Sequence, residues 1–146
     1  MHFAPVLAFA LAQQFTNVSA THLPPLGLPT ESAKFGDWDL DGDLDLVYAN
    51  GGDLGNKQSR LLFNKGLTGN GATGSGTIGT FGDATGSHLL PNFVQSSRDV
   101  TVADIDLDGY YDLHFSNHSD LSNQSNTWFI NQGLAQGGEI GRYVLD

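Results

Sequence analysis

Two short acidic stretches carry the chemistry that this sequence makes available. Residues 37–45 read D-W-D-L-D-G-D-L-D and residues 104–112 read D-I-D-L-D-G-Y-Y-D, so both follow the pattern D-x-D-x-D-G-x-x-D. Carboxylates at alternate positions repel one another unless a cation lies among them. Calcium fits better than magnesium, because it accepts about six to eight oxygens in irregular geometry. The sequence therefore predicts two Ca²⁺ sites per chain.

The position of each residue in the loop predicts its role. Side-chain oxygens are expected from the first, third, fifth and ninth places: Asp37, Asp39, Asp41 and Asp45 in one loop, and Asp104, Asp106, Asp108 and Asp112 in the other. At the seventh place only the backbone carbonyl needs to bind, so Asp43 and Tyr110 can be equivalent ligands. Gly42 and Gly109 mark the turn, because glycine reaches positive φ without strain.

A solvated acidic turn and an EF-hand are the alternatives to these sites. One copy of the pattern is compatible with a solvated turn, but two complete copies favour metal binding. An EF-hand loop closes with a bidentate glutamate at its twelfth place and lies between helices. The twelfth residues here are Tyr48 and Phe115, and the residues around them have β-type composition without a helical period.

The acidity of the chain is concentrated in these two loops. The 146 residues carry a formal net charge of -10 and no cysteine. Nine of the 16 acidic residues lie in the loops, and the other seven nearly balance six basic residues. Because there is no basic patch, nucleic acid is disfavoured as a partner. Because no disulfide can form, metal ions would be the cross-links of an extracellular protein.

An apolar segment, Met1 to Ala12, opens the chain and ends in an Ala-x-Ala pattern. The pattern is typical of a signal peptide cleaved after Ala12, but the positively charged start of such a peptide is missing. The alternative, which we prefer, is a retained strand or short helix that packs within the fold or against a neighbour. The segment is too short for a transmembrane helix.

The remainder of the chain is an internal repeat. Residues 14–25 align with residues 80–91 at an offset of 66, and one inserted residue later the offset becomes 67. At that spacing Asn64 meets Asn131, and the two acidic loops coincide. The chain is therefore divided into an apolar segment over 1–13, a first repeat over 14–79 and a second repeat over 80–146. A unit of this length accommodates four short strands.

Each repeat is expected to hold antiparallel strands, with the acidic loop as the tip of the hairpin between the first two. The first strands are expected at 32–36 and 99–103, the second at 45–49 and 112–116, the third at 60–64 and 127–131, and the fourth at 80–84 and 142–146, with another copy of the fourth at 14–18. A Gly, Thr and Ser-rich stretch over 66–79 predicts an exposed flexible loop.

The repeat resembles a known family. Phe35-Gly36 directly precede the first acidic loop, Leu62-Phe63-Asn64 follow it, and Thr80-Phe81-Gly82-Asp83 close the unit. With the loops, these residues are similar to FG-GAP/VCBS repeats, over about residues 14–133. The resemblance implies an all-β fold of two four-stranded antiparallel β-propeller-type blades with calcium-binding hairpin loops. Two blades cannot close a ring, so they are expected to belong to a larger propeller or to an assembly.

The expected function is that of a non-enzymatic calcium-binding repeat module, extracellular or at the cell surface, with a structural or adhesive role. Its expected partners are other copies, in a self-assembled filament, or further repeats of a longer chain. Catalysis by calcium as a Lewis acid is disfavoured, because four carboxylates and a carbonyl leave little room for substrate.

The alternative function is a carbohydrate- or protein-binding accessory propeller fragment of a larger secreted enzyme or receptor. In that case exposed Trp38 and Tyr110 would stack on a glycan; their other interpretation is packing over the loops. His22 and His88 occupy matching repeat positions, which favours a structural role. The pair His114 and His118 lacks the companions of a zinc site. The N-glycosylation acceptor pattern occurs at Asn17, Asn117 and Asn123.

Overall fold

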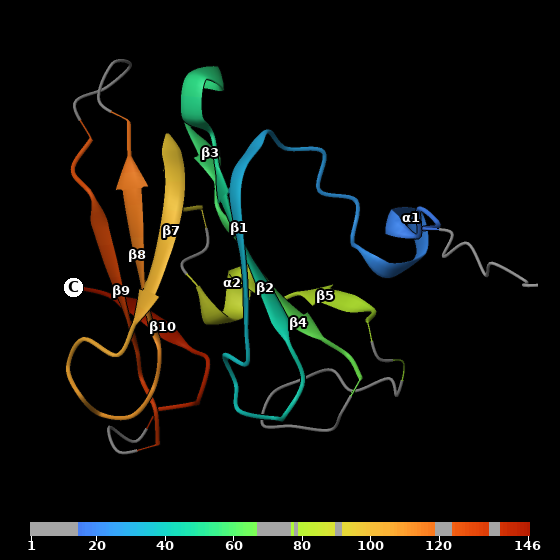
Figure 1. Cartoon of the computed structure of the whole chain (residues 1–146). Coiled ribbons are helices and arrows are strands. Elements are labelled where there is room, and N and C mark those ends of the chain that lie inside the picture. The colour runs from blue at the N-terminus through green and yellow to red at the C-terminus, as the bar shows by residue number, and fades with distance from the viewer. Residues whose placement is uncertain (1–14, 67–76, 78, 90–91, 119–123, 135–137) are drawn as a thin grey trace, which may run out of the picture.

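A computed structural model describes residues 15–66, 77, 79–89, 92–118, 124–134 and 138–146 (Figure 1). The strands are β1 (Thr30–Gly36), β2 (Asp45–Asn50), β3 (Lys57–Gln58), β4 (Arg60–Asn64), β5 (Phe81–Asp83), β6 (Val94–Gln95), β7 (Ser97–Ala103), β8 (Asp112–Asn117), β9 (Thr127–Asn131) and β10 (Tyr143–Leu145). The helical turns are α1 (Ser19–His22), α2 (Thr85–His88) and the 3-10 turn η1 (Gly52–Leu54). The apolar segment 1–13, most of the glycine-rich stretch and Asn123 lie outside the described residues.

Two four-stranded antiparallel sheets hold most of the strands. The first sheet has the order β1-β2-β4-β5, and the second has the order β10-β9-β8-β7. Apart from the front strand at 14–18, the expected strands are confirmed with ends that shift by no more than two residues, and the all-β class is confirmed with them. The acidic loops join β1 to β2 and β7 to β8, and they lie at the same end of the two sheets (Figure 1).

Strand register decides which residues share a face. In the first sheet, Phe35 lies opposite Leu46 and Leu46 opposite Leu62, while Val47 lies opposite Leu61 on the other face. Apolar residues occupy both faces of β2 and β4 because both faces of these central strands are covered. The sequences of these strands therefore read as apolar runs rather than as an alternation.

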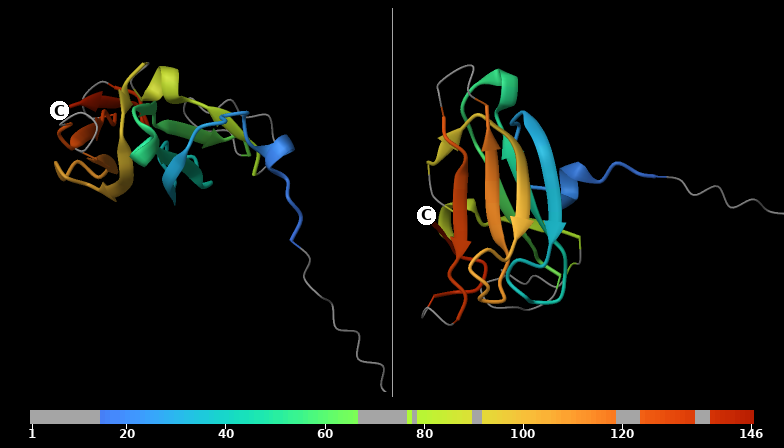
Figure 2. Two further views of the ribbon diagram at one scale, coloured as in Figure 1. Left: turned by 90° about the horizontal axis from the view of Figure 1, so that it is seen from above. Right: turned by 60° about the vertical axis from the view of Figure 1, so that its left-hand side comes forward.

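The two sheets pack against each other, with β1 beside β7 (Figure 2). Their facing sides, which we call the inner faces, form the core with the linker residue Leu89: Val47, Ala49, Leu61 and Phe63 from the first sheet, and Val100, Leu113, Phe115, Phe129 and Tyr143 from the second. The opposite sides are called the outer faces. At the junction, the Asp99 carboxylate accepts a hydrogen bond of 2.5 Å from Ser32 Oγ and lies 3.3 Å from Lys34 Nζ. The Ser32 hydrogen bond is the main reason that the pKa of Asp99 is lowered.

A second contact between the repeats was not expected from the sequence. The short strands β3 and β6 pair with each other, and Ser96 Oγ donates to the carbonyl oxygen of Gly52 at 2.5 Å. Arg98 and Asp53 form an ion pair beside them. These strands are only two residues long, so they show no hydrophobic period by which the sequence could have predicted them.

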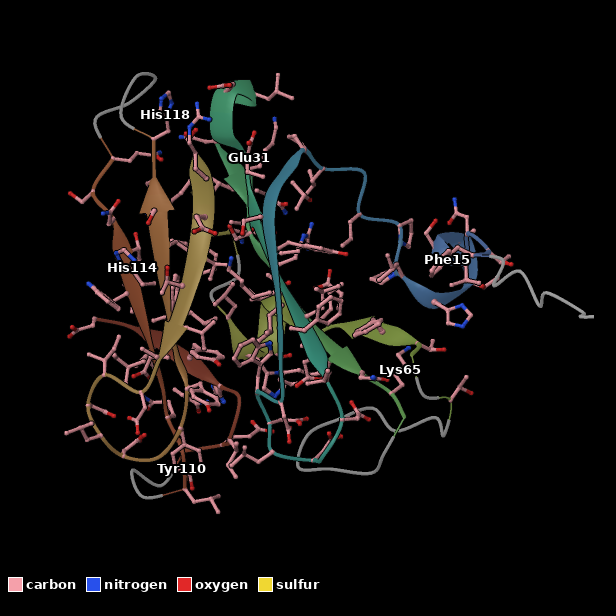
Figure 3. All side chains as sticks on the ribbon, viewed as in Figure 1. Phe15, Glu31, Lys65, Tyr110, His114 and His118 are labelled. Carbon is pink, nitrogen blue, oxygen red and sulfur yellow. The ribbon has the colours of Figure 1, made fainter. Side chains whose placement is uncertain are left out.

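The expected front strand at 14–18 is wrong for residues 15–18, which form no strand; Gln14 lies outside the described residues. The matching segment after residue 80 becomes β5 because it pairs with β4. The third strand of each sheet, β4 or β9, already pairs with a fourth strand, β5 or β10. Among the described residues, neither third strand therefore has a free edge for residues 15–18. Phe15, which matches Phe81, is 99% exposed and projects from the sheets (Figure 3).

Candidate metal centres

Backbone amides fold the first acidic loop around its own carboxylates. The Asp41 amide donates to Asp37 Oδ1 at 3.0 Å and to Asp39 Oδ1 at 3.2 Å, and the Gly42 amide donates to Asp37 Oδ2 at 3.1 Å. The Asp43 amide donates to Asp41 Oδ1 at 3.1 Å. These side-chain turns hold the first, third and fifth aspartates toward the loop interior, as aspartate does in tight turns.

The second loop repeats this hydrogen-bond pattern. The Asp108 amide donates to Asp104 Oδ1 at 3.1 Å and to Asp106 Oδ1 at 3.2 Å, and the Gly109 and Tyr110 amides complete the set. The positive φ expected of the two glycines is confirmed, with 97° at Gly42 and 93° at Gly109. The equivalence of the two loops therefore extends from sequence to atomic contacts.

The leucines two residues before these glycines also have positive φ, with 57° at Leu40 and 63° at Leu107. A left-handed conformation is uncommon for a non-glycine residue. The sequence motif gave no warning of it, although leucine at the same place of both loops is visible in the repeat. Both side chains point outward and are exposed.

The aspartate at the ninth place anchors each loop to its sheet. Asp45 Oδ2 accepts from the Trp38 amide at 2.9 Å, and Asp45 Oδ1 accepts from the Asn64 amide at 2.9 Å. In the second loop, Asp112 accepts from the amides of Ile105 and Asn131, each at 2.8 Å. Both carboxylates are fully buried. The ninth residue thus ties the start of its own loop to the third strand of its sheet.

An asparagine at the end of each third strand extends this anchor. Asn64 Nδ2 donates to the Leu44 carbonyl at 3.1 Å, and its Oδ1 accepts from the Gly79 amide at 2.9 Å. Asn131 Oδ1 accepts from the amides of Gly133 and Gly141 in the same way. In the sequence, Asn64 and Asn131 are matching positions without an expected role. The sign of this anchor in the sequence is that asparagine occurs at the same place in both repeats.

The structure brings carboxylate oxygens of each loop together. Within each of two groups, one oxygen per residue lies within 4.8 Å of the others: Asp37, Asp39 and Asp45 in the first loop, and Asp104, Asp106 and Asp108 in the second. The other expected ligands, Asp41, Asp43, Tyr110 and Asp112, belong to the same loops but not to these groups. The full ligand set stays a prediction.

Several oxygens in the loops are suited to a cation. Asp39 Oδ2, Asp41 Oδ2 and Asp108 Oδ2 are buried, and no hydrogen bond satisfies them within the described part of the chain. A buried carboxylate oxygen without a donor is costly, and a cation among several such oxygens removes the cost. The donor set consists of oxygen alone, which is the preference of Ca²⁺ and Mg²⁺. The residues therefore fit a hard divalent cation.

In the ion-free loop, burial works against the charged form of these carboxyls. Burial, reinforced by the charge of Asp41, raises the pKa of Asp39 to about 7. Burial also raises the pKa of Asp45 to about 7, although the amides of Asn64 and Trp38 oppose the shift. The pKa values of Asp41 and Asp112 are raised as well, again chiefly by burial. Without a cation the loops therefore hold protons that unfolded chains would release.

The pH dependence of stability follows from these shifts. A carboxyl whose folded pKa is raised stabilises the fold below its unfolded pKa of about 4, and this contribution is lost as pH rises through the folded pKa of about 7. The calcium-free protein is expected to melt at least ~5 °C lower at pH 8 than at pH 5. Thermal melts across this range measure how the melting temperature changes with pH. With saturating calcium, the melting temperature should instead rise with pH.

One variant makes this pH test specific. Asp39→Asn cannot titrate and should flatten the slope of melting temperature against pH in the calcium-free protein. A calcium-free melting temperature that rises between pH 5 and pH 8 would contradict the assignment.

Trp38 and Tyr110, the two loop aromatics considered for glycan binding, pack against the fold. Trp38, expected as exposed in the glycan-binding alternative, is only 2% exposed, so that expectation is wrong. Its ring lies edge-on to Tyr111, at a centroid distance of 6.2 Å, and rests against Gly36 where a Cβ would clash. The Tyr110 ring rests in the same way against Gly133. These contacts correspond to the second interpretation, packing over the loops.

Three histidines and Asn117 have contacts within the fold. His88 is buried, and its ring lies edge-on to Phe63 at a centroid distance of 4.8 Å. His114 lies against Trp128 at 4.1 Å, and His118 lies near Arg98. Asn117 Nδ2 donates to the Ser125 carbonyl at 2.7 Å, so this amide is engaged inside the fold.

Comparison with protein-family models, curated proteins and solved structures finds no match to this chain. The resemblance to FG-GAP/VCBS repeats therefore stands on the residues of the repeat themselves. Among the described residues, no helix has the length and apolar character needed to cross a membrane.

Proposed function

We propose that this chain is a calcium-binding repeat module with a structural, non-enzymatic role outside the cell, and that each four-stranded sheet is one propeller-type blade. The observation that carries the proposal is the duplication of the loop. The same four hydrogen bonds, from three backbone amides, hold the same aspartates in both repeats, and buried carboxylate oxygens remain for a cation.

Calcium is the better candidate for this cation than magnesium. The carboxylates are held by backbone hydrogen bonds in a nine-residue loop, and the groups differ between the repeats, with Asp45 in one and Asp108 in the other. Such variation suits the irregular coordination of calcium but not the strict octahedron of magnesium. Extracellular modules bind calcium with dissociation constants of about 10⁻⁴–10⁻³ M, which matches fluids rich in calcium.

The bound ions would act as cross-links. Each loop joins two strands of its sheet, and its ninth residue is bonded to the third strand, so an ion in the loop fixes three strands at one end. In a chain without cysteine this is the available substitute for disulfides. The loops contain no nucleophile poised beside a base, and their carboxylates face one another.

Variants of the fifth and seventh places test the proposal. Asp41→Ala and Asp108→Ala should each abolish one of two sites, because each removes a buried oxygen that has no hydrogen-bond donor among the described residues. Asp43→Ala should retain two sites, since only its backbone carbonyl is assigned as a ligand. Isothermal titration calorimetry measures the stoichiometry: two ions for the unmodified chain and Asp43→Ala, one for each other variant, and none for the double variant. Equal losses from Asp41→Ala and Asp43→Ala would overturn the ligand assignment.

A further inference from the structure

The contact between the two sheets can be compared with the outer faces, because the two sheets are repeats of each other. It joins the inner face of the first sheet to the inner face of the second. The repeat offset of 67 places β1, β2 and β4 on β7, β8 and β9, and the strand registers place β5 on β10. The outer face of the first sheet is therefore equivalent to the inner face of the second, and the outer face of the second sheet is equivalent to the inner face of the first.

The outer face of the first sheet has the composition of an interface but lacks a covering sheet among the described residues. Phe35 is 62% exposed, while its equivalent Val102 packs against the core. Tyr48 is half-buried, while its equivalent Phe115 is 1% exposed. Phe35 and Tyr48 are thus more accessible than the residues at the same positions inside the chain, while Leu46 and Leu62 at the centre of this face are buried.

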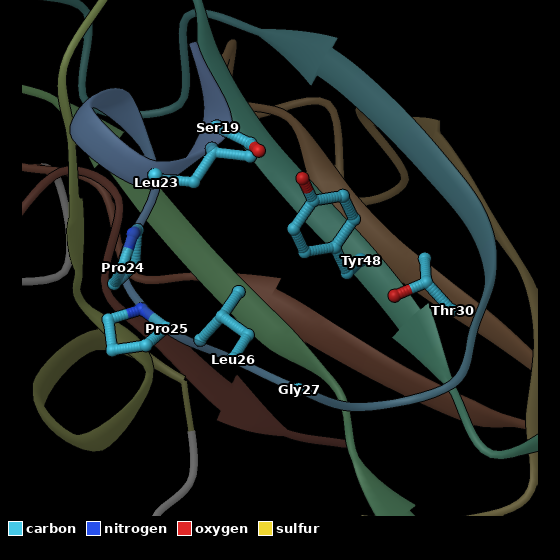
Figure 4. Close-up of a pocket in the computed structure, with 9 residues that line it drawn as sticks. Ser19, Leu23, Pro24, Pro25, Leu26, Gly27, Thr30 and Tyr48 are labelled. Carbon is cyan, nitrogen blue, oxygen red and sulfur yellow. The ribbon is translucent and has the colours of Figure 1, made fainter. Parts of the chain in front are cut away.

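The segment between α1 and β1 is also more exposed than its equivalent between α2 and β7. After α2, Leu89 and Phe93 cross the sheet interface and pack on its core. Their equivalents Leu23 and Leu26 follow α1, and they line an open hollow of about 550 Å³ over the first sheet. Tyr48 forms the opposite wall of this hollow (Figure 4). The residues that fill the interface between the two sheets therefore have equivalents that line an open hollow on the first sheet.

The outer face of the second sheet carries the complementary half. Trp128 stands at the position of the fully buried Leu61 and is 40% exposed, and Ile130 stands at the position of the buried Phe63. Val144, opposite Ile130 in β10, adds another exposed apolar side chain to this face. Isolated exposed apolar residues need no explanation, but a patch matching a buried surface indicates a partner.

Two departures show where a contact between outer faces would differ from the contact between the inner faces. His114 replaces Val47 and stacks on Trp128, so the second outer face is more polar than the inner face to which it is equivalent. Glu31 stands at the position of Arg98, so the ion pair between Arg98 and Asp53 is not repeated. Both changes make this contact weaker than the one within the chain.

We propose that the occupant of each outer face is a second copy of this chain, whose first sheet packs its outer face on the outer face of the second sheet. The inference deepens the proposed structural role and rests on it. Both complementary surfaces belong to one chain, so the contact is head-to-tail and each copy keeps one face open for the next. Such contacts build rings or filaments according to whether their rotation closes.

Charged substitutions on the two faces test this geometry. Phe35→Lys disables the first-sheet face and leaves the second-sheet face intact, and Trp128→Lys does the reverse. In calcium-containing buffer at ~100 µM, the unmodified chain should show masses that are multiples of 15.6 kDa by light scattering. Each variant alone should remain at 15.6 kDa, and an equimolar mixture should form a dimer with twice that mass.

The controls separate this proposal from the proposed function. Leu54→Lys changes an exposed side chain of η1 that lies on neither face, and it should assemble as the unmodified chain does. Val144→Lys should reproduce Trp128→Lys without removing the ring that contacts His114. A monomer that binds two calcium ions would overturn the interface alone, as would a mixture of variants that stays monomeric. Loss of calcium binding in a chain that assembles would overturn the metal assignment alone.

Discussion

Removal of calcium is expected to lower the melting temperature of the protein by ~10 to 20 °C. An ion that binds only the folded state stabilises it by about 2.7 kcal/mol per site at a hundred times the dissociation constant. Two sites together contribute roughly 5 kcal/mol, and in a chain of this size one kcal/mol corresponds to about 2–4 °C. Because the ion-free loops also keep buried carboxyls with raised pKa values, the calcium-free state bears an additional cost.

Thermal melts with increasing free calcium measure this effect directly. The melting temperature should rise with the logarithm of calcium concentration above the dissociation constant, and excess chelator should remove the rise. Magnesium at equal concentration is the control and should restore only a small part of the shift, because it dehydrates reluctantly. Identical melting curves in calcium and in chelator, with no calcium uptake by calorimetry, would contradict the proposed sites.

The strands beside the loops could be predicted because their signals are local. The motif fixes where each hairpin turns, and the alternating or apolar residues on both sides fix the strands that it joins. Gly42 and Gly109 were predicted with positive φ for the same reason, since only the loop itself decides their conformation. Because the two repeats are equivalent, each prediction made for one sheet also applied to the other.

The front segment could not be predicted in this way, because strand pairing depends on a distant partner. Residues 15–18 match residues 81–84 in sequence, yet only the latter have an open edge at β4. Trp38 illustrates the same limit. Its position in an acidic loop indicated exposure, whereas Gly36 beside it leaves the space in which the indole is buried. Local sequence describes what a segment can do, and the tertiary environment selects among the possibilities.

The ninth aspartate links the metal site to the stability of the sheets, and its removal is expected to have the largest effect of any loop substitution. Asp45→Ala leaves the buried amides of Trp38 and Asn64 without acceptors, at a cost of about 1–3 kcal/mol each. It also removes an expected calcium ligand. We therefore expect the free energy of unfolding to fall by ~3 kcal/mol or more even in chelator, with a further loss in calcium.

The comparison of Asp45→Ala with Asp41→Ala separates the two roles of a loop carboxylate. Asp41 accepts one bond from within its own loop, whereas Asp45 ties the loop to β4. Denaturant unfolding should therefore show Asp41→Ala close to the unmodified chain in chelator but less stable in calcium, and Asp45→Ala less stable in both. Asp112→Ala should behave as Asp45→Ala, because its carboxylate holds the amides of Ile105 and Asn131 in the same geometry. If Asp45→Ala lost stability only in calcium, its anchoring role would be wrong and its sole contribution would be to the ion.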